Sequence, residues 1–352
     1  MHSTKTVIFI TLFAAIFTIN VGARVCDNNL SATESLSTKE IPLLKTFVDP
    51  IVIKKYVEQN FAPYATVETE IINVGVNDIY LVVIGTEKYV LRLSRADKNL
   101  TLTDSSFLFE LTWLEYLNDH HVPISFPIRR IDQQLFGIID AFEGPRYATL
   151  FSYAEGTTDI NAEQAFILGR SLAHLHVVSD DFITELEHEN LDVDQLIDQP
   201  LKQLKDTLDS SWENELQFLD QLTEKLKKQI SKIGKLNGAY GIIAGDIHGS
   251  NQHFTTDNQL TMFDFEFCAY GYRVYDIATF RWGQGSDIDL WNAFLNGYQS
   301  CRKLNPTELE SIDHFVLARN LWWMSSISKM PEYQNEIDDE FWEFAFSQFH
   351  RQ

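Results

Sequence analysis

The chain has 352 residues, of which 28 are Lys or Arg and 50 are Asp or Glu, so its formal net charge is −22. A nucleic-acid binder needs basic surface to displace counterions, and this charge balance therefore argues against that class and against anionic membrane surfaces. Apolar residues make up 45% and aromatic residues 13%, which is enough for a packed core. The length predicts two domains, or one large domain with two lobes.

The first 23 residues have the pattern of an export signal or membrane anchor. Lys5 precedes a nearly unbroken apolar run from Val7 to Ile19, and small residues allow cleavage after Ala23. A misassigned start, or an apolar helix packed on the body of the protein, is the alternative interpretation. Residues 24–48 are predicted to be a linker.

The first half of the chain is rich in strand signals. A helical period covers residues 51–61 and is followed by β-branched runs at 66–74 and 79–84. Gly75-Val76-Asn77-Asp78 has turn composition, and a third strand is predicted at 89–93. Three consecutive strands of this kind predict an antiparallel meander.

A helix is predicted next at residues 105–117, with Asp104 as its N-cap. Two further strands are predicted at 134–139 and 147–153. The first half therefore reads as a small five-stranded α+β lobe that ends near Gly156.

The second half is mainly helical. Residues 162–177 carry apolar side chains at helical spacing, with Gly169 where a close helix contact would fit. Residues 191–235 are charged and favour helix, and residues 287–352 return to helix. Short strands are predicted at 242–244, 252–255 and 260–263.

Two acidic loops lie close together in the sequence. The first contains Asp246 and Asn251, and the second contains Asp264, with short strands between them that form a hairpin. Carboxylate and amide oxygens suit Mg²⁺, and a carboxylate can orient a hydroxyl nucleophile. Phosphoryl transfer needs both parts, and the Asp–Asn–Asp spacing matches their arrangement in kinases.

These loops resemble those of the aminoglycoside phosphotransferase and choline kinase superfamily, which includes homoserine kinase-like enzymes. The resemblance rests mainly on the two acidic loops, which read GDIHGSN and FDFEFCAYGYRVYDIA. It also includes the helix with Gly169 and His176 and the strand Tyr89–Leu93, and it covers about residues 70–280. It implies an α+β, protein-kinase-like fold of two lobes. A small antiparallel-sheet N-lobe (49–153) would bind nucleotide, and a mainly helical C-lobe (154–352) would carry the catalytic and acceptor sites.

The resemblance also implies roles for individual residues. Asp246 would be the catalytic base that orients the acceptor hydroxyl, and Asn251 and Asp264 would bind Mg²⁺. Arg92 would reach the nucleotide phosphates. Glu110 on the following helix would form the ion pair that holds Arg92, with Glu115 as the rival.

The remaining implied roles concern the nucleotide and the support of the loops. Residues 75–80, including Gly75 and Asn77, would form the loop over the phosphates. Backbone groups from Phe151 to Tyr153 would meet adenine. Asp276 would be a buried carboxylate that ties the catalytic and metal loops together. The family often has His before the catalytic Gly-Asp pair, where this chain has Ala244.

The predicted function is therefore transfer of the γ-phosphoryl group of ATP to a hydroxyl of a small-molecule acceptor. A Ser/Thr protein kinase of the same fold and a silent nucleotide-binding pseudokinase stay open as alternatives. ATP use favours the cytoplasm, whereas residues 1–23 favour export or anchoring. The negative charge is compatible with a cationic acceptor. Trp322 and Trp323 would line the acceptor pocket or belong to the core, and His248 would contact substrate or support its loop.

Overall fold

The computed structural model describes residues 46–95, 104–235, 238–284, 287–330, 333 and 337–350. The predicted export segment 1–23 lies outside these residues. The described chain forms two compact units: the first contains residues 46–95 and 127–153, and the second contains 104–126 and the described residues from 154 to 350. The sequence placed 104–126 in the N-lobe, but this segment packs in the second unit, where Trp113 Nε1 donates to Ser179 Oγ at 2.9 Å.

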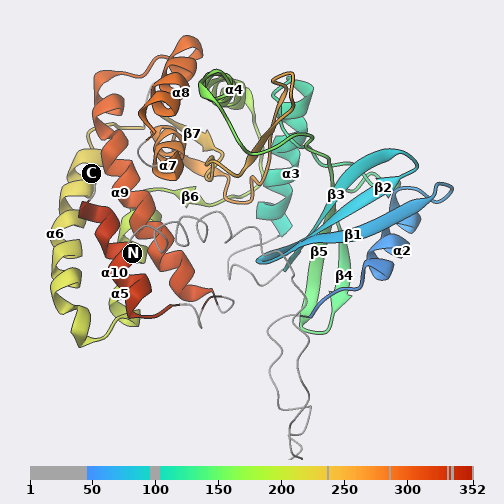
Figure 1. Ribbon diagram of the computed structural model, residues 1–352, viewed down its shortest axis with the longest axis horizontal. Coiled ribbons are helices and arrows are strands. Elements are labelled where there is room, and N and C mark those ends of the chain that lie inside the picture. The colour runs from blue at the N-terminus through green and yellow to red at the C-terminus, as the bar shows by residue number, and fades with distance from the viewer. Residues whose placement is uncertain are drawn as a thin grey trace, which may run out of the picture. The chain divides into compact units, whose positions relative to one another are not determined.

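The first unit is a five-stranded antiparallel sheet with one helix against it (Figure 1). Its elements are α2 (Pro50–Asn60), β1 (Val67–Val74), β2 (Asn77–Ile84), β3 (Glu87–Arg95), β4 (Gly137–Ala141) and β5 (Gly144–Ser152). The strand order is β1-β2-β3-β5-β4, so the predicted meander is confirmed and β5 inserts between β3 and β4. Because β2 begins at Asn77, the predicted four-residue turn is wrong, and the connection contains only Gly75 and Val76.

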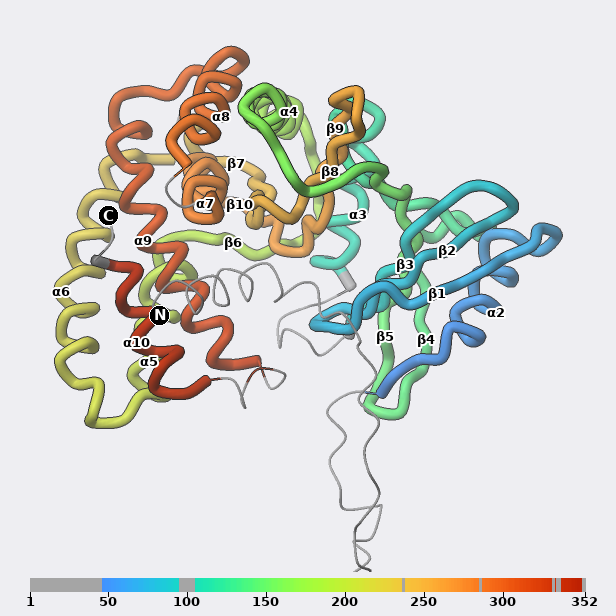
Figure 2. The backbone as a smooth tube through the Cα atoms, in the orientation of Figure 1, coloured from blue at the N-terminus to red at the C-terminus, as the bar shows by residue number. Residues whose placement is uncertain are grey.

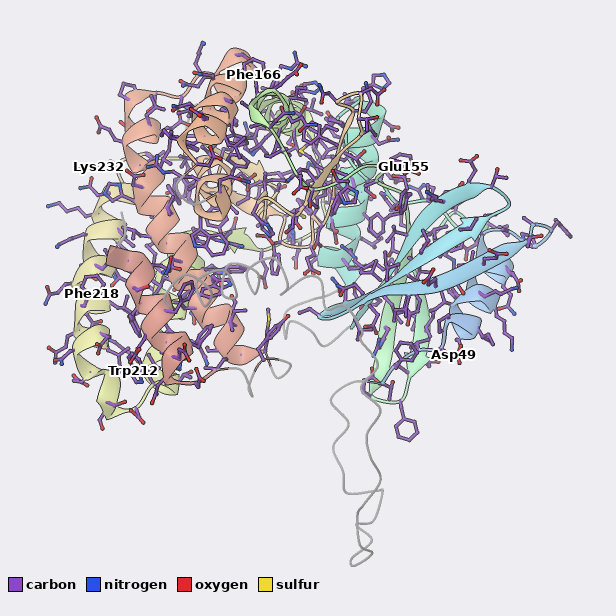
Figure 3. All side chains as sticks on the ribbon, in the orientation of Figure 1. Asp49, Glu155, Phe166, Trp212, Phe218 and Lys232 are labelled. Carbon is purple, nitrogen blue, oxygen red and sulfur yellow. The ribbon has the colours of Figure 1, made fainter. Side chains whose placement is uncertain are left out.

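Helix α2 shows how local sequence builds this unit. The Asp49 side chain, labelled in Figure 3, accepts a hydrogen bond from the Ile51 backbone N–H at 2.8 Å, and Pro50 fits the first helical position. Ile53 and Val57 are one helical turn apart and fully buried against the sheet. The cap thus fixes where the helix begins, and its apolar stripe fixes which face covers the sheet.

The second unit is mainly helical. Its helices are α3 (Asp104–Asp119), α4 (Ala162–Val178), α5 (Gln199–Thr207), α6 (Glu213–Ile230), α7 (Val274–Gln284), α8 (Ile288–Cys301), α9 (Pro306–Lys329) and α10 (Asp339–Ser347). Single helical turns occur at Ser179–Asp181, Asp194–Asp198, Ser210–Trp212 and Gln348–His350. None of the helices in the described ranges is long and apolar enough to cross a membrane.

Two small sheets carry the loops of this unit. Strands β6 (Asn190–Leu191), β10 (Ala269–Tyr272) and β7 (Tyr240–Ile243) form one sheet in the order β6-β10-β7. Strands β8 (Gln252–Phe254) and β9 (Leu260–Met262) form the predicted antiparallel hairpin, with Gln252 opposite Met262. The hairpin follows one acidic loop and precedes the other, so it brings both loops to the same place.

Helices α4 and α8 lie side by side at unusually close range (Figure 2). A Cβ on Gly169 would lie 2.0 Å from the carbonyl oxygen of Phe294, and a Cβ on Gly297 would lie 2.0 Å from that of Phe166, which Figure 3 labels. The predicted close contact at Gly169 is therefore confirmed. It allows His176, two turns further along α4, to reach a side chain of α8.

Candidate active site

The catalytic loop, residues 244–251, begins directly after β7 and is fixed at its start by a buried carboxylate. Asp276, on the first turn of α7, accepts hydrogen bonds from the Ala244 N–H at 2.7 Å and the Gly245 N–H at 2.8 Å. Gly245 has φ +84°, and a Cβ there would lie 2.0 Å from the carbonyl oxygen of Phe267. Only glycine satisfies both conditions without displacing the second acidic loop.

Asp276 is itself held by a relay of buried side chains. His176 Nε2 lies 2.9 Å from Asp276 Oδ2, and His176 Nδ1 lies 2.8 Å from the Tyr298 hydroxyl. Burial lowers the pKa of His176 to about 4, although Asp276 raises it, so the imidazole is neutral near pH 7. His176 therefore donates to Asp276 and accepts from Tyr298, whose oxygen accepts from Arg302 Nη1 at 3.0 Å.

This relay revises the expectation for Asp276. The resemblance placed this carboxylate between the catalytic and metal loops. Its hydrogen bonds instead connect the catalytic loop to α4. The two loops are joined by Gly245, which packs against Phe267, and by a backbone hydrogen bond from Phe263 to Asn251.

Asp246 is buried, with 3% of its surface exposed. Its Oδ1 accepts a hydrogen bond from Arg319, while its Oδ2 lies 3.5 Å from both His248 Nε2 and Asn251 Nδ2. Burial raises the pKa of Asp246, but the Arg319 guanidinium and His248 outweigh it and lower the pKa to about 2. The carboxylate is therefore ionised near pH 7, with one oxygen occupied and the other only weakly bonded.

Asn251 supplies an oxygen donor beside this carboxylate, and Asp264 supplies a second one in the neighbouring acidic loop. Asn251 Nδ2 donates to the Asp246 backbone carbonyl at 2.9 Å, so the amide oxygen is the end of the side chain suited to a metal. The Phe263 N–H donates to the Asn251 carbonyl at 3.0 Å, and Asp264 follows with φ +64°. A carboxylate and an amide oxygen are hard donors that fit Mg²⁺. No group of three or more His, Cys, Asp or Glu side chains that could hold a metal ion occurs within the described ranges.

The first unit carries the residues predicted to meet nucleotide. Arg92 lies on β3 with 5% of its surface exposed, and its guanidinium carbon is 5.0 Å from the ring centroid of Phe151 on β5. Tyr153 follows the end of β5, and Lys88 Nζ lies 5.0 Å above its ring. The Gly75 N–H donates to the Asn77 carbonyl at 3.1 Å, which closes the short turn before β2. In the predicted phosphate loop, residues 77–80 belong to β2 rather than to a loop.

Glu110 lies on α3 in the second unit. It is 4% exposed, whereas its rival Glu115 is half-buried on the same helix. A buried carboxylate needs a partner more than a solvated one does, so burial favours Glu110 for a structural ion pair. Arg92 and Glu110 belong to different units, and their pairing stays a prediction.

Sequence reasoning missed Arg319, which lies 73 residues after Asp246. Its guanidinium donates to the Tyr275 hydroxyl at 3.1 Å as well as to Asp246. Its central carbon lies 4.7 Å from the ring centroid of Trp322 and 5.1 Å from that of Trp282. The sequence did offer one signal for it. Phe315 lies four residues before Arg319 and Trp323 four residues after it, so the arginine falls within an apolar helical stripe and is expected to be buried.

The two tryptophans considered for the acceptor pocket have different environments. Trp322 is half-buried, stacks on Arg319 and meets Phe267 edge-on at 5.3 Å. Trp323 is 8% exposed and packs against Phe341 at 5.7 Å. Trp322 therefore lies beside Asp246's partner, whereas Trp323 belongs to the core.

The fold and these loops define a protein-kinase-like phosphotransferase. The family model described as the phosphotransferase enzyme family matches residues 69–311, and the chain belongs to that family. An uncharacterized protein of Deinococcus radiodurans is 30% identical, covering 90% of this chain and 94% of its own length. A homoserine kinase of Agrobacterium fabrum is 25% identical, covering 68% and 76%.

Solved structures agree on the fold. An amicoumacin kinase solved in complex with AMP-PNP and Ca²⁺ superimposes with a TM-score of 0.66 at 18% identity, covering 84% of this chain and 88% of that one. The predicted α+β kinase-like fold is therefore confirmed, and the family model over residues 69–311 confirms the predicted superfamily.

Proposed function

We propose that this protein transfers the γ-phosphoryl group of ATP to a hydroxyl group of a small-molecule acceptor. The observation that carries the proposal is the buried, ionised Asp246, with one carboxylate oxygen bound by Arg319 and the other only weakly bonded. Asn251 lies beside it and directly precedes the β8–β9 hairpin, and Asp264 follows that hairpin. Their order and spacing are those that kinase-type phosphoryl transfer requires.

Asp246 Oδ2 is the atom proposed to orient the acceptor hydroxyl and to take its proton. Arg319 holds Oδ1, so rotation of the carboxylate away from the acceptor would break an ion pair that is buried on both sides. The relay from His176 through Asp276 fixes the backbone immediately before Asp246. The loop is thus positioned before the acceptor binds, and positioning supplies much of the rate in phosphoryl transfer.

Asn251 and Asp264 are proposed to hold Mg²⁺. The ion, when bound, would neutralise charge on the nucleotide phosphates. Arg92 is proposed to contact the same phosphates from the first unit, with Glu110 as its partner. Gly75 and Asn77 are proposed to cover the phosphates, and Phe151 and Tyr153 to border adenine. The bound nucleotide analogue of the amicoumacin kinase supports ATP as the donor.

The test is an ADP-release assay with the purified full chain, ATP, Mg²⁺ and a broad panel of alcohols. Asp246→Asn should lower kcat by about 10²–10⁴-fold, because general-base residues contribute factors of this size. Asp257→Asn is the matched control, since Asp257 is an exposed carboxylate in the turn between β8 and β9 and bonds only locally to Thr255.

The outcomes separate the proposal from its alternatives. Acceptor-dependent ADP release that requires Mg²⁺ and is lost in Asp246→Asn supports the proposal. Full activity of that variant would refute the role of Asp246. Mg²⁺-dependent ATP binding without turnover on any alcohol would favour a pseudokinase, and transfer to protein substrates alone would favour a protein kinase.

A further inference from the structure

Arg319 occupies a position that has the chemistry of a binding site for an organic cation. Two half-buried indole rings face its guanidinium, with Trp322 at 4.7 Å and Trp282 at 5.1 Å, and the Asp246 carboxylate lies at its end. Aromatic faces together with a carboxylate are the groups that hold ammonium and guanidinium ligands. Here the cation belongs to the chain itself.

The surroundings hold this arrangement in place. Phe267 packs edge-on against Trp322 at 5.3 Å, and Trp323 supports Trp282 at 6.0 Å. Tyr275 accepts from Arg319 at 3.1 Å, and Arg319 as a whole is 3% exposed. A buried guanidinium with fixed partners at both Nη atoms is a permanent part of the site.

One donor of Arg319 has no partner among the described residues. Its Nε–H is buried and makes no hydrogen bond there, whereas both Nη groups are paired. A buried donor without an acceptor is costly, and an oxygen of a ligand would satisfy it. The remaining bonding capacity of this residue therefore suits a hydroxyl or carboxylate oxygen and repels an ammonium group.

We propose that Arg319 is a specificity-determining residue that takes the place of a substrate cation, so that the enzyme accepts neutral or anionic alcohols and rejects alcohols with an ammonium group beside the reacting hydroxyl. This inference rests on the proposed function, because it assumes that the acceptor hydroxyl meets Asp246. It reverses the expectation drawn from the net charge of −22. Long-range attraction of cations acts at the surface, whereas the group that touches Asp246 is already positive.

The experiment measures kcat/KM on matched triplets of alcohols that differ in one substituent. Ethanolamine, ethylene glycol and glycolate form the smallest triplet, and 3-amino-1,2-propanediol, glycerol and glycerate form a larger one. The wild-type protein should favour the neutral or anionic member at least tenfold over the ammonium member. Arg319→Gln should shift that ratio at least tenfold toward the ammonium member, and Arg319→Lys should keep the wild-type order.

Arg281→Gln is the matched control. Arg281 also stacks on an indole, at 4.9 Å from Trp291, and pairs with a carboxylate, Asp313, at 3.3 Å, but it has no contact with Asp246. This variant should leave the order of acceptors unchanged. A wild-type preference for ammonium acceptors would overturn the proposal. An equal loss of kcat/KM on all three alcohols of a triplet in Arg319→Gln would also overturn it, because a purely structural role of Arg319 gives that result.

A second measurement does not depend on turnover. In Arg319→Ala, millimolar methylguanidinium should bind to the vacated position, as measured by calorimetry, and it should not bind to the wild-type protein. Absence of binding to a folded Arg319→Ala variant would show that the indoles and Asp246 form no cation site. If Arg319→Ala does not fold, the proposal is tested by the order of kcat/KM values that the wild-type protein shows for the three alcohols of each triplet. Failure of the wild type to phosphorylate any alcohol would refute the proposed function, and methylguanidinium binding would still report on the site itself.

Discussion

The contact between the two acidic loops can be tested at a single atom, the missing Cβ of Gly245. In Gly245→Ala the new methyl carbon would start 2.0 Å from the Phe267 carbonyl oxygen, and ordinary contact at 3.4 Å requires a displacement of about 1.4 Å. Overpacking of this kind costs about 1–3 kcal/mol. The positive φ of +84° adds about 1–2 kcal/mol for a residue with a side chain. Together the two terms lower the free energy of unfolding by about 2–5 kcal/mol.

The same displacement should reach the chemistry, because Asp246 is the next residue. A misplacement of about 1 Å in a reacting group can lower the rate by roughly 10²-fold. Gly245→Ala should therefore lower kcat by about two orders of magnitude, while the affinity for ATP changes less.

The control for this prediction is Gly234→Ala. Gly234 also has a positive φ, of +68°, but a Cβ there meets nothing within 4 Å. Urea denaturation of the two variants separates backbone strain, which they share, from the steric overlap, which only Gly245→Ala has. Equal losses of stability, together with an unchanged kcat in Gly245→Ala, would refute the tight contact between the loops.

Two further predictions concern the relay and the proposed phosphate site. Burial lowers the pKa of His176 to about 4, so between pH 6.5 and pH 4 the unfolded chain binds a proton that the folded chain does not, and stability falls as the pH falls through this window. His176→Gln should reduce the fall in the free energy of unfolding between pH 6.5 and pH 4 by up to about 3 kcal/mol, whereas the exposed control His314→Gln should leave it unchanged. If the two variants showed parallel plots of stability against pH, the buried imidazole of His176 would not be neutral. Arg92→Gln should raise the KM for ATP about 10–100-fold, because this is the size expected when a hydrogen bond to a charged group is lost. The control Arg130→Gln should leave the KM unchanged. An unchanged KM in Arg92→Gln would show that Arg92 does not contact the phosphates.

The fold was predictable where local sequence decides the structure. The strands of the first sheet are β-branched runs separated by turn residues, and those signals lie within each segment. The start of β2 was missed because Asn77 is a strand residue by virtue of its partner Ser94 on β3, which composition does not reveal. A strand end depends on pairing, and pairing is a tertiary property.

In residues 191–235, by contrast, tertiary packing rather than local sequence decides where the helices begin and end. Their composition favours helix throughout, yet the chain leaves helix at Leu208 and re-enters it at Glu213. Both α5 and α6 pack on α9, and the break allows Leu204 and Leu219 to be buried. Burial of two apolar stripes outweighs the modest propensity lost at the break.

The candidate site divides in the same way. Asp246 and Asn251 precede one short hairpin and Asp264 follows it, so the proximity of the two loops follows from the sequence. Arg319 reaches Asp246 only because α7 and α9 pack together, and no spacing rule connects the two residues. The positive charge of Arg319 at Oδ1, on which the proposed acceptor preference rests, therefore could be found only from the tertiary structure.

The departure at Ala244 from the family's common histidine can now be explained in physical terms. Asp276 binds residue 244 through its backbone N–H, and this hydrogen bond is available to any residue except proline. The imidazole that contacts Asp276 comes from α4, as His176, whose position depends on the close α4–α8 contact at Gly169. The hydrogen bond at residue 244 thus does not depend on the identity of its side chain, whereas the contacts of Gly169 and His176 do depend on theirs. The support of the catalytic loop is therefore distributed over two helices that the acidic motif itself does not include.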